Sequence, residues 1–587
     1  APTADPQRLT SWSFNGYLMM TFLTAVNDSM FRWMICPIAR HLFKDDVWHI
    51  AGYSLQPAEI VLPLGLFVFV LPFVIFAPWA GWVADRFSKR TSIIWLKSTE
   101  VALMAGGLIA IQQGHVTSMF ALLFLIGAQA TLIGTAKYGI IPELVRRSDI
   151  SAANGLSGVA TLIGSIVGTV AGYTLADLTI VNRAAGIPTA AIALLGVALL
   201  GVVGALMTTH VNAANPTVRF QWNLVTDSWR DLKLVINDRA ILRVSFGIVF
   251  FWSLAALAQM NIDVFVTTEL SDVTKVSPAP FMAMLVIGVG IGSLLAGWLS
   301  NGRVELGMVP FGTLLMGLAC ILLYFCSDSP VMTGAMLVMI GLGGGLFNVP
   351  LNAYIQERSP HEKLGAILAA VQQLTAVGML CVSGLFWMMH TPMRMSGAQI
   401  FLLSGMGIIP IVIYAVWILP QATIRFFVWL LSRFVYRVST YGIENIPERG
   451  PALLVANHVS WIDGVLILLA SSRPIRMVAY ADYVQGRFAR WLSNLFGIIP
   501  IRAGDGPRAL IQSLNTARDA LNSGQLVCIF AEGKISRTGQ LQKFERGMLR
   551  ILKDTDAPVV PVCLDELWGS IFSYERVKFI WKKPKYW

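Results

Sequence analysis

The chain has 587 residues, of which 55% are hydrophobic and only 13% are charged, and its formal net charge is +11. Because soluble domains carry about 25% charged residues, this composition excludes a wholly soluble protein and predicts several membrane spans. The six cysteines are scattered without a C-x-x-C pair, so we expect no disulfide framework, no metal site and no bound cofactor.

The first 420 residues are predicted to form an all-α polytopic membrane domain. The polar start, residues 1–12, leads directly into a long apolar segment, which favours a first span over a cleavable signal peptide. About twelve segments are apolar for the length that a bilayer requires. These predicted spans are 14–38, 60–84, 91–112, 117–141, 152–176, 188–208, 241–265, 279–300, 307–326, 331–355, 365–389 and 398–419. The longest interior polar stretch, 209–240, follows the sixth span and indicates a 6+6 arrangement.

The basic residues between the spans predict the orientation, because positive charges accumulate in cytoplasmic loops. One set of alternating connections holds Arg86, Lys89, Arg90, Arg146, Arg147, Arg219, Arg230, Lys233, Arg239, Arg303, Arg358 and Lys363. The opposite set holds only Arg40, Lys44, Arg183, Lys275 and Arg394. We therefore expect both termini, and the region after residue 420, to lie in the cytoplasm.

The loop after the second span reads GWVADRFSKR over residues 81–90. It resembles the loop signature of the major facilitator superfamily, G-x-x-x-D-R-x-G-R-R, through Gly81, Asp85, Arg86 and Arg90, with Ser88 where the family usually has Gly. The resemblance implies a carrier that alternates its access. In such a carrier these four residues form a conformational latch between neighbouring helices.

Two further patterns favour this fold. The sequence GWLSNGR at 297–303, after the eighth span, is a degenerate copy of the same loop without its Asp and indicates an internal repeat. Gly164, Gly168 and Gly172 form a small-residue stripe that predicts close helix packing.

Polar side chains inside the predicted spans are candidates for a transport path, since burying them in lipid is costly. The candidates are Asn27, Asp28, Arg32, Lys97, Glu100, Lys137 and Asp263. Asp28 and Arg32 are one helical turn apart, and Lys97 and Glu100 are three residues apart, so each pair could neutralise its charges. Structural pairing between helices, or snorkelling near span ends, is the alternative to a path for a lipid headgroup.

Residues 421–440 mix aromatic residues with arginines and are predicted to form an amphipathic linker helix at the membrane interface, the alternative being a plain linker. Residues 441–587 then alternate short apolar runs with helical patterns, which predicts an α/β domain. The expected strands are 452–456, 526–530 and 559–564, and the expected helices are 483–496 and 508–523. Residues 421–587 carry 22 Lys and Arg against 13 Asp and Glu, a basic balance that suits anionic lipid or an acidic protein and offers nothing specific to nucleic acid.

Four blocks of this domain resemble, in family order, those of the glycerolipid acyltransferase superfamily. They are Asn457-His458-x4-Asp463, GIIPIR at 497–502, FAEGKIS at 530–536 and VVPV at 559–562. A lone H-x4-D pattern is common by chance, so the order of the four blocks carries the resemblance.

The resemblance implies the transfer of an acyl group from a thioester to a lipid hydroxyl. A neutral imidazole at His458 suits the general base, and Asp463 would orient that ring. Arg502 would pair with the lipid phosphate, and Glu532 and Gly533 would shape the acceptor site. The implied substrate-binding set is Asn457, Arg502, Glu532, Gly533 and Lys534. A satisfied core histidine is the structural alternative for His458, and a surface salt bridge is the alternative for Arg502.

The third block, with Glu532-Gly533-Lys534-Ile535, resembles the 2-acylglycerophosphoethanolamine acyltransferase branch. Its natural partner is a lysophospholipid transporter of the major facilitator type, which the stretch AKYGIIPEL at 136–144 also resembles. The implied protein of the bacterial inner membrane moves lysophosphatidylethanolamine, or lysophosphatidylglycerol, to the inner leaflet. It then reacylates that lipid from acyl carrier protein or coenzyme A. Family members often continue into an acyl-carrier-protein synthetase domain. The acyltransferase domain also looks a strand and a helix short, so we expect it to be incomplete at its C-terminus and more chain to follow.

Two rival interpretations remain open at this point. The membrane half could be a proton-coupled exporter of drugs or solutes fused to a glycerolipid acyltransferase, or it could be only an anchor. An intramembrane carboxylate that titrates during transport would favour the exporter, whereas direct movement of lysolipid would exclude the anchor.

Overall fold

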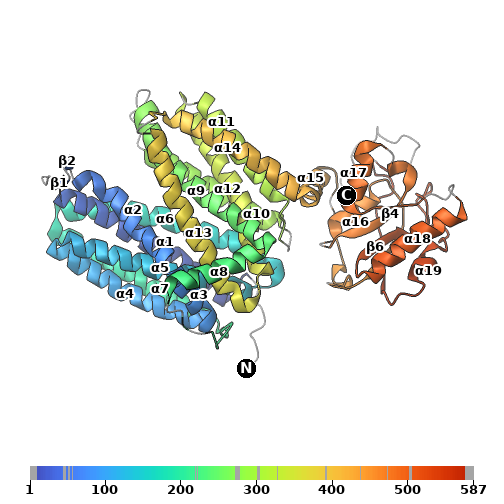
Figure 1. The fold of residues 1–587 in the computed structure, drawn as a ribbon, viewed down its shortest axis with the longest axis horizontal. Coiled ribbons are helices and arrows are strands. Elements are labelled where there is room, and N and C mark those ends of the chain that lie inside the picture. Colours follow the sequence, from blue (N-terminus) through green and yellow to red (C-terminus); the bar gives the residue numbers. More distant parts are fainter. Residues whose placement is uncertain are drawn as a thin grey trace. The chain divides into compact units, whose positions relative to one another are not determined.

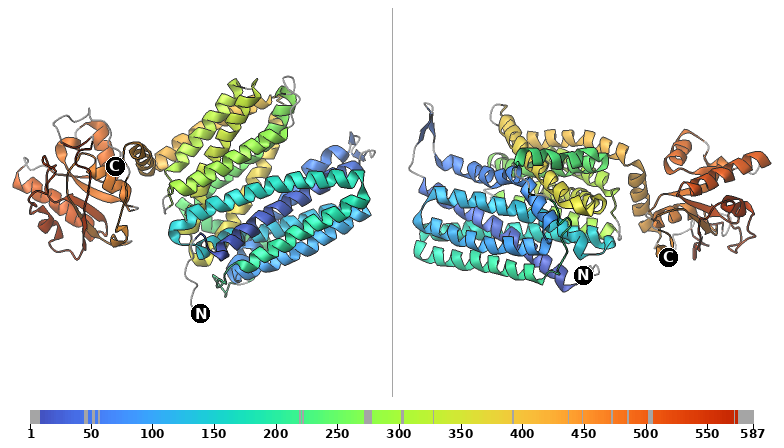
Figure 2. Two further views of the ribbon diagram at one scale, coloured as in Figure 1. Left: turned by 180° about the vertical axis from the view of Figure 1, so that it is seen from behind. Right: turned by 60° about the horizontal axis from the view of Figure 1, so that its bottom comes forward.

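The computed structural model describes residues 9–43, 48–50, 53–55, 57–218, 220, 223–270, 278–300, 304–326, 328–390, 393–436, 438–447, 449–471, 473–484, 486–501, 506–570 and 572–574. The chain forms two compact units, residues 1–415 and 416–587, which divide close to the predicted boundary at 420. Figures 1 and 2 show a helical first unit and a second unit built around a sheet.

The first unit consists of long helices and one short hairpin, β1 (Trp48–Ile50) with β2 (Tyr53–Leu55). The helices before the central connection are α1 (Trp12–Leu42), α2 (Pro57–Ile75), α3 (Ala77–Arg86), α4 (Lys89–Gln113), α5 (Val116–Leu144), α6 (Ile150–Val181) and α7 (Arg183–Met207). The connection contains α8 (Leu224–Asn237). The helices after it are α9 (Arg239–Phe265), α10 (Pro278–Leu299), α11 (Met308–Phe325), α12 (Pro330–Arg358), α13 (Leu364–His390) and α14 (Gly397–Ile418).

In the described part of the chain, ten helices are long and apolar enough to cross a membrane. The second predicted span is the exception in shape, because it is divided at Phe76 into α2 and α3, which meet at 57°. Counted as one span, this pair makes eleven. Helix α1 has 31 residues but contains Asn27, Asp28 and Arg32, which keep it out of that apolar set. The all-α membrane domain predicted from the sequence is therefore confirmed.

The glycine stripe of α6 lies directly on α1. A Cβ atom at Gly164, Gly168 or Gly172 would lie 2.2–2.6 Å from the carbonyl oxygen of Phe22, Val26 or Met30, respectively, so only glycine allows this approach. The second half contains the same glycine-mediated contact, since a Cβ at Gly288 or Gly292 of α10 would lie 2.1–2.2 Å from a carbonyl oxygen of α12. Both halves therefore hold their helices together by the same close backbone contact.

Gly168→Ala is expected to lower the thermal stability of the detergent-solubilised protein, because overpacking costs about 1–3 kcal/mol and outweighs the gain of about 0.5–1 kcal/mol from replacing a helical glycine. Gly196→Ala is the matched control, since no atom lies within 4 Å of a Cβ placed there. Its midpoint of unfolding should stay unchanged or rise. Equal losses in both variants would contradict this packing argument.

The second unit begins with α15 (Pro420–Val435), where the sequence predicts an amphipathic helix, and continues into the α/β domain. Its sheet has the order β5-β4-β6-β3-β7, and every neighbouring pair is parallel. The strands are β3 (Ala452–Ala456), β4 (Ile475–Tyr480), β5 (Ile499–Ile501), β6 (Leu526–Phe530) and β7 (Val559–Val562). The helices are α16 (Asp463–Ala470), α17 (Arg487–Phe496), α18 (Pro507–Asn522) and α19 (Gly547–Leu552).

Each face of the sheet is buried, as expected when crossover helices cover a parallel sheet. Leu453 and Val527 lie in one core cluster with Leu514 and Leu521 of α18, whereas Leu454 and Cys528 lie in the other with residues such as Ile467 of α16. The three predicted strands are present, but β4 and β5 were missed. Parallel strands bring their carboxyl ends to one edge, so the loops after β3 and β6 lie side by side there.

Candidate functional sites

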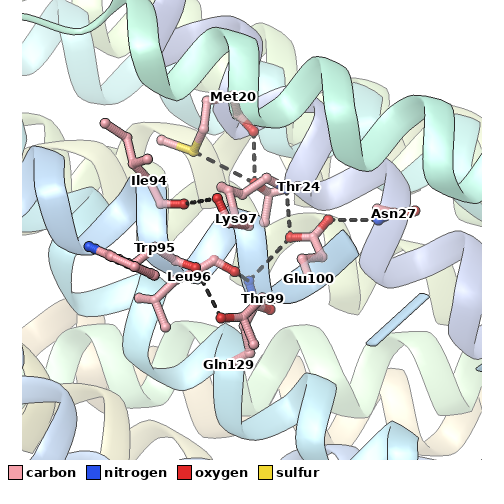
Figure 3. A network of polar contacts seen from close by, with 11 residues as sticks. Met20, Thr24, Asn27, Ile94, Trp95, Leu96, Lys97, Thr99, Glu100 and Gln129 are labelled. Carbon is pink, nitrogen blue, oxygen red and sulfur yellow. Dashed lines mark hydrogen bonds and ion pairs between the residues drawn. The ribbon is translucent and has the colours of Figure 1, made fainter. Parts of the chain in front are cut away.

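A buried polar network joins three helices inside the first unit (Figure 3). At its centre the Glu100 carboxylate of α4 accepts hydrogen bonds from Asn27 Nδ2 of α1 at 2.6 Å and from Gln129 Nε2 of α5 at 3.2 Å. Lys97 Nζ lies 2.6 Å from Glu100 Oε2, and both side chains are fully buried. The ion pair predicted from their spacing is therefore formed, and Gln129 is a member that the sequence reasoning missed.

Other residues predicted to line a transport path are placed differently. Asp28 and Arg32 do not form the expected direct pair, since Asp28 Oδ1 and Arg32 Nε both lack hydrogen-bond partners and the Arg32 guanidinium lies over the rings of Trp33 and Phe69. The two side chains are thus not joined by a direct hydrogen bond, and aromatic rings, which helical spacing does not reveal, contact the arginine.

Two candidates lie outside this network. Lys137 of α5 lies 5.0 Å from the centre of the Tyr138 ring, and its side chain is almost fully buried. The side chain of Asp263, in α9, is outside the described part of the chain.

Lys97→Ala and Glu100→Ala should each lower the free energy of unfolding by about 3–5 kcal/mol, because each leaves the opposite charge buried without its partner. The double variant Lys97→Met with Glu100→Gln should lose much less stability than the sum of the single variants. Thermal unfolding in detergent measures both effects. Additive losses would show that the two charges are not coupled.

The predicted latch residues lie where the two halves of the first unit meet. Asp85 accepts hydrogen bonds from the backbone N–H groups of Gly365 at 2.8 Å and Ala366 at 3.1 Å, at the start of α13. A carboxylate is favoured at a helix N-terminus, where the N–H groups have no other partner. The Asp85 carboxylate thus binds a helix of the other half.

The remaining latch residues support the same contact region. A Cβ at Gly81 would lie 2.9 Å from Ala366 Cα, so glycine permits α3 and α13 to touch. Arg90 donates to the carbonyl oxygens of Thr208 and Leu206 at the end of α7, a favourable place for a cation. Arg86 is half-buried.

Two further contacts join the halves in this region. Glu143 of α5 pairs with Lys89 and lies 2.9 Å from His361 Nε2, which follows α12. Asn154 of α6 and Gln356 of α12 exchange two side-chain hydrogen bonds, at 2.7 and 3.1 Å, in a buried position. These contacts keep this end of the carrier closed in the structure.

The second site lies at the carboxyl edge of the sheet. His458 follows β3, and its Nδ1 lies 2.9 Å from Oδ2 of Asp463, the first residue of α16. Asp463 is fully buried, and its carboxylate also accepts from the backbone N–H groups of Val459 and Ser460 and from the Ser460 hydroxyl. Because this carboxylate oxygen can accept a hydrogen bond from Nδ1–H, the arrangement favours the tautomer that presents the lone pair of Nε2.

The surroundings of His458 fix its ring and its backbone. The ring stacks on Phe530, the last residue of β6, with centroids 3.9 Å apart. Glu532, almost fully buried, accepts from the backbone N–H of His458 at 3.0 Å and of Gln542 at 2.8 Å. Ser536 N–H donates to the His458 carbonyl at 2.7 Å. Phe530, Ser460 and Ser536 were missed as site residues, although all three lie inside the sequence blocks.

Other predicted residues of this site have mixed outcomes. Both ends of the Asn457 amide bond the backbone of Leu564, at 2.7 and 2.9 Å, so Asn457 positions the loop and we correct its assignment to substrate binding. Gly533 adopts φ +68°, which favours glycine, and Lys534 is exposed. Arg502 lies outside the described residues.

A cysteine nucleophile at β6 is not supported. Burial raises the pKa of the Cys528 thiol to about 12, so this group stays protonated at neutral pH. The arrangement therefore suits a histidine that deprotonates an attacking hydroxyl.

Glu532→Gln should lower the kcat of acyl transfer about tenfold or more, with little change in the KM for the lipid acceptor. The reason is that the amide cannot accept from both backbone N–H groups, so the His458 loop loses a restraint while the acceptor contacts remain. Steady-state kinetics with varied acceptor measure this. A large increase in KM at constant kcat would instead assign Glu532 to acceptor binding.

Two family models match the chain: "Major Facilitator Superfamily" over residues 18–383 and "Acyltransferase" over residues 437–565. The chain belongs to the major facilitator superfamily. It also carries an acyltransferase domain, so the protein is an acyltransferase fused to a transporter homologue.

The curated relatives match the membrane half. Lysophospholipid transporter LplT from Enterobacter sp. (strain 638) is 29% identical over 351 residues, which are 59% of this chain and 84% of that protein. The protein of the same name from Salmonella newport (strain SL254) is 28% identical over the same shares.

Solved structures share the fold of the first unit. The human organic anion transporter MFSD10 has a TM-score of 0.54 at 13% identity, over 68% of this chain and 98% of that one. The E. coli fucose:proton symporter FucP has a TM-score of 0.52 at 15% identity, over 69% and 98%. At such low identity these matches show the fold alone.

Proposed function

We propose that the membrane unit moves lysophospholipid, namely lysophosphatidylethanolamine or lysophosphatidylglycerol, from the outer to the inner leaflet and that the second unit reacylates it to a diacyl phospholipid. The observation that carries this proposal is the His458–Asp463 pair, which has the geometry of a general base and its orienting carboxylate. This pair is in one chain with a membrane unit whose relatives are lysophospholipid transporters. The product of the first step is then the substrate of the second.

The end at which the two halves meet supports the proposed orientation of the carrier in the membrane. Arg86, Lys89 and Arg90 lie in the region where Asp85 binds the start of α13, and basic residues favour the cytoplasmic side. In Figure 1 the two groups of helices converge near α3 and α8 and spread apart toward α11 and the β1–β2 hairpin. With the basic end in the cytoplasm, both termini and the acyltransferase domain lie on the cytoplasmic side.

The chemical step follows from the geometry of His458. The free hydroxyl oxygen of the lysolipid attacks the thioester carbon while its proton passes to His458 Nε2, and Asp463 stabilises the imidazolium that forms. The carbon–sulfur bond then breaks, and the leaving thiolate takes the proton from His458. The donor is an acyl thioester, and the basic balance of the domain suits either of the two anionic carriers, acyl carrier protein or coenzyme A.

A proton-coupled exporter remains the second candidate, because Asp28 has a buried carboxylate oxygen without a hydrogen-bond partner. Such a carboxylate could bind and release a proton during transport. Lysolipid movement that is insensitive to a pH gradient, together with no export of small solutes, would exclude this candidate.

His458→Ala should lower acylation of lysophosphatidylethanolamine by about 10²–10⁴-fold in proteoliposomes, because the reaction loses its general base. Movement of the same lysolipid across the bilayer should stay at the wild-type rate, measured by back-extraction with albumin.

The matched control for this variant is His115→Ala, an exposed histidine beside α5, which should change neither rate. Acylation that survives in the His458 variant would contradict the assigned base. Absence of lysolipid movement in the wild-type protein would contradict the proposed transport.

A further inference from the structure

Helix α17, which joins β4 to β5, carries large apolar residues on its exposed face in addition to the half-buried Leu492 and Phe496. Its buried residue is Ser493, which is 4% exposed. Two of its largest apolar residues, Phe488 and Trp491, are 73% and 48% exposed and lie against each other with ring centroids 5.8 Å apart. Large apolar groups that face outward from a folded domain indicate a surface that binds something.

The charge of this surface is of one sign. α17 contains Arg487 and Arg490, the adjacent α15 contains Arg425 and Arg433, and neither helix contains an Asp or Glu. Aromatic residues combined with arginines are typical of helices that lie in the interface of an anionic membrane.

The covalent chain keeps α17 near the bilayer. α14 is apolar enough to span a membrane and ends at Ile418, and Gln421 donates a hydrogen bond from its side chain to the carbonyl of Leu495 in the last turn of α17. Three residues extend at most about 11 Å, and a ten-residue helix is about 15 Å long. The Leu495 end of α17 is therefore tied, through Gln421, to a point within about 11 Å of chain from the end of α14. α15 and α17 lie side by side in the second unit (Figure 1).

The position of α17 also relates it to the site of acyl transfer. The crossover that contains α17 leaves the sheet after β4, at the carboxyl edge. His458 lies at that same edge, after β3. A lipid surface held by Phe488 and Trp491 would thus border the edge from which an acceptor lipid reaches His458.

We propose that α17 is a second membrane-binding element of the acyltransferase domain, which inserts Phe488 and Trp491 among the lipids while Arg487 and Arg490 bind anionic headgroups. An acidic carrier protein could bind the arginines. Such binding would not explain why Phe488 and Trp491 are exposed, or why α17 is bonded to Gln421 so close to the end of a membrane span. The docking of such a carrier on α17 is the alternative outcome of the test.

Nitroxide labels at Phe488→Cys and Trp491→Cys test this directly in the full chain, reconstituted in vesicles of phosphatidylethanolamine and phosphatidylglycerol. The background replaces Cys326, Cys381 and Cys563, which are not buried, with Ser. Both labels should be more accessible to oxygen than to a water-soluble nickel complex, as in lipid, and Gln512→Cys on the exposed face of α18 should show the reverse. Greater nickel access at 488 and 491, or immobilisation there only after acyl carrier protein is added, would overturn the proposal.

A second measurement rests on the proposed acylation of lysophospholipid. The double variant Phe488→Ser with Trp491→Ser should acylate vesicle-borne lysolipid about tenfold more slowly but a monomeric short-chain lysolipid at the normal rate. Leu549→Ser, at an exposed apolar residue of α19, is the matched control and should change neither rate. Equal losses with both acceptors would contradict membrane binding by α17. If no form of the chain acylates lysolipid, the proposed function fails while the label accessibilities still decide the role of α17.

Discussion

One physical constraint governs four buried carboxylates in the candidate sites: a carboxylate that is buried away from water needs hydrogen-bond donors around it. Glu100 meets it with side chains from three helices, and Asp85 meets it with the first N–H groups of α13. Asp463 and Glu532 meet it with the backbone around His458. In each case satisfying the charge also fixes the arrangement that function requires.

The same constraint gives the two units different mechanical properties. Asp85 binds backbone groups of another helix through two hydrogen bonds at the meeting of the halves, a contact that can separate when the carrier changes state. Asp463 and His458 are five residues apart in one loop. Glu532 and Ser536, which follow β6, form hydrogen bonds to the backbone of His458 and restrain that loop. The base, which must act at a defined distance, is thus restrained within one domain, whereas the contact of Asp85 joins two halves that separate in a carrier of alternating access.

Much of this could be predicted from local sequence. Apolar runs of the right length gave the helices of the membrane unit, and H-x4-D after an apolar strand placed His458 and Asp463 together. The bend at Phe76 was missed although Pro78 lies in the first turn of α3, where a proline cannot donate the hydrogen bond that would continue α2. Strand β4 was missed because Arg476 interrupts its apolar pattern, and β5 because it has only three residues.

Contacts between segments that are far apart in the chain could not be predicted, because local sequence patterns do not identify which segments become neighbours. Helical spacing allowed Asp28 to pair with Arg32, but Phe69, from α2, and Trp33 hold the arginine. The donors to Glu100 come from positions 27 and 129, and nothing in either local pattern identifies them as neighbours. Asn457 was misassigned because its partner, Leu564, lies more than a hundred residues away in the chain.

A reversible cross-link at the closed end of the carrier tests the central claim most directly. The side chains of Asn154 in α6 and Gln356 in α12 exchange hydrogen bonds between the two halves, so cysteines at these two positions can be joined by a short, reducible bis-methanethiosulfonate cross-linker. Cross-linked protein should not acylate lysolipid supplied to the outer leaflet, should still acylate lysolipid supplied on the side of the acyltransferase domain, and should recover the first activity on reduction. Acylation of outer-leaflet lysolipid at an unchanged rate in the cross-linked protein would contradict the account.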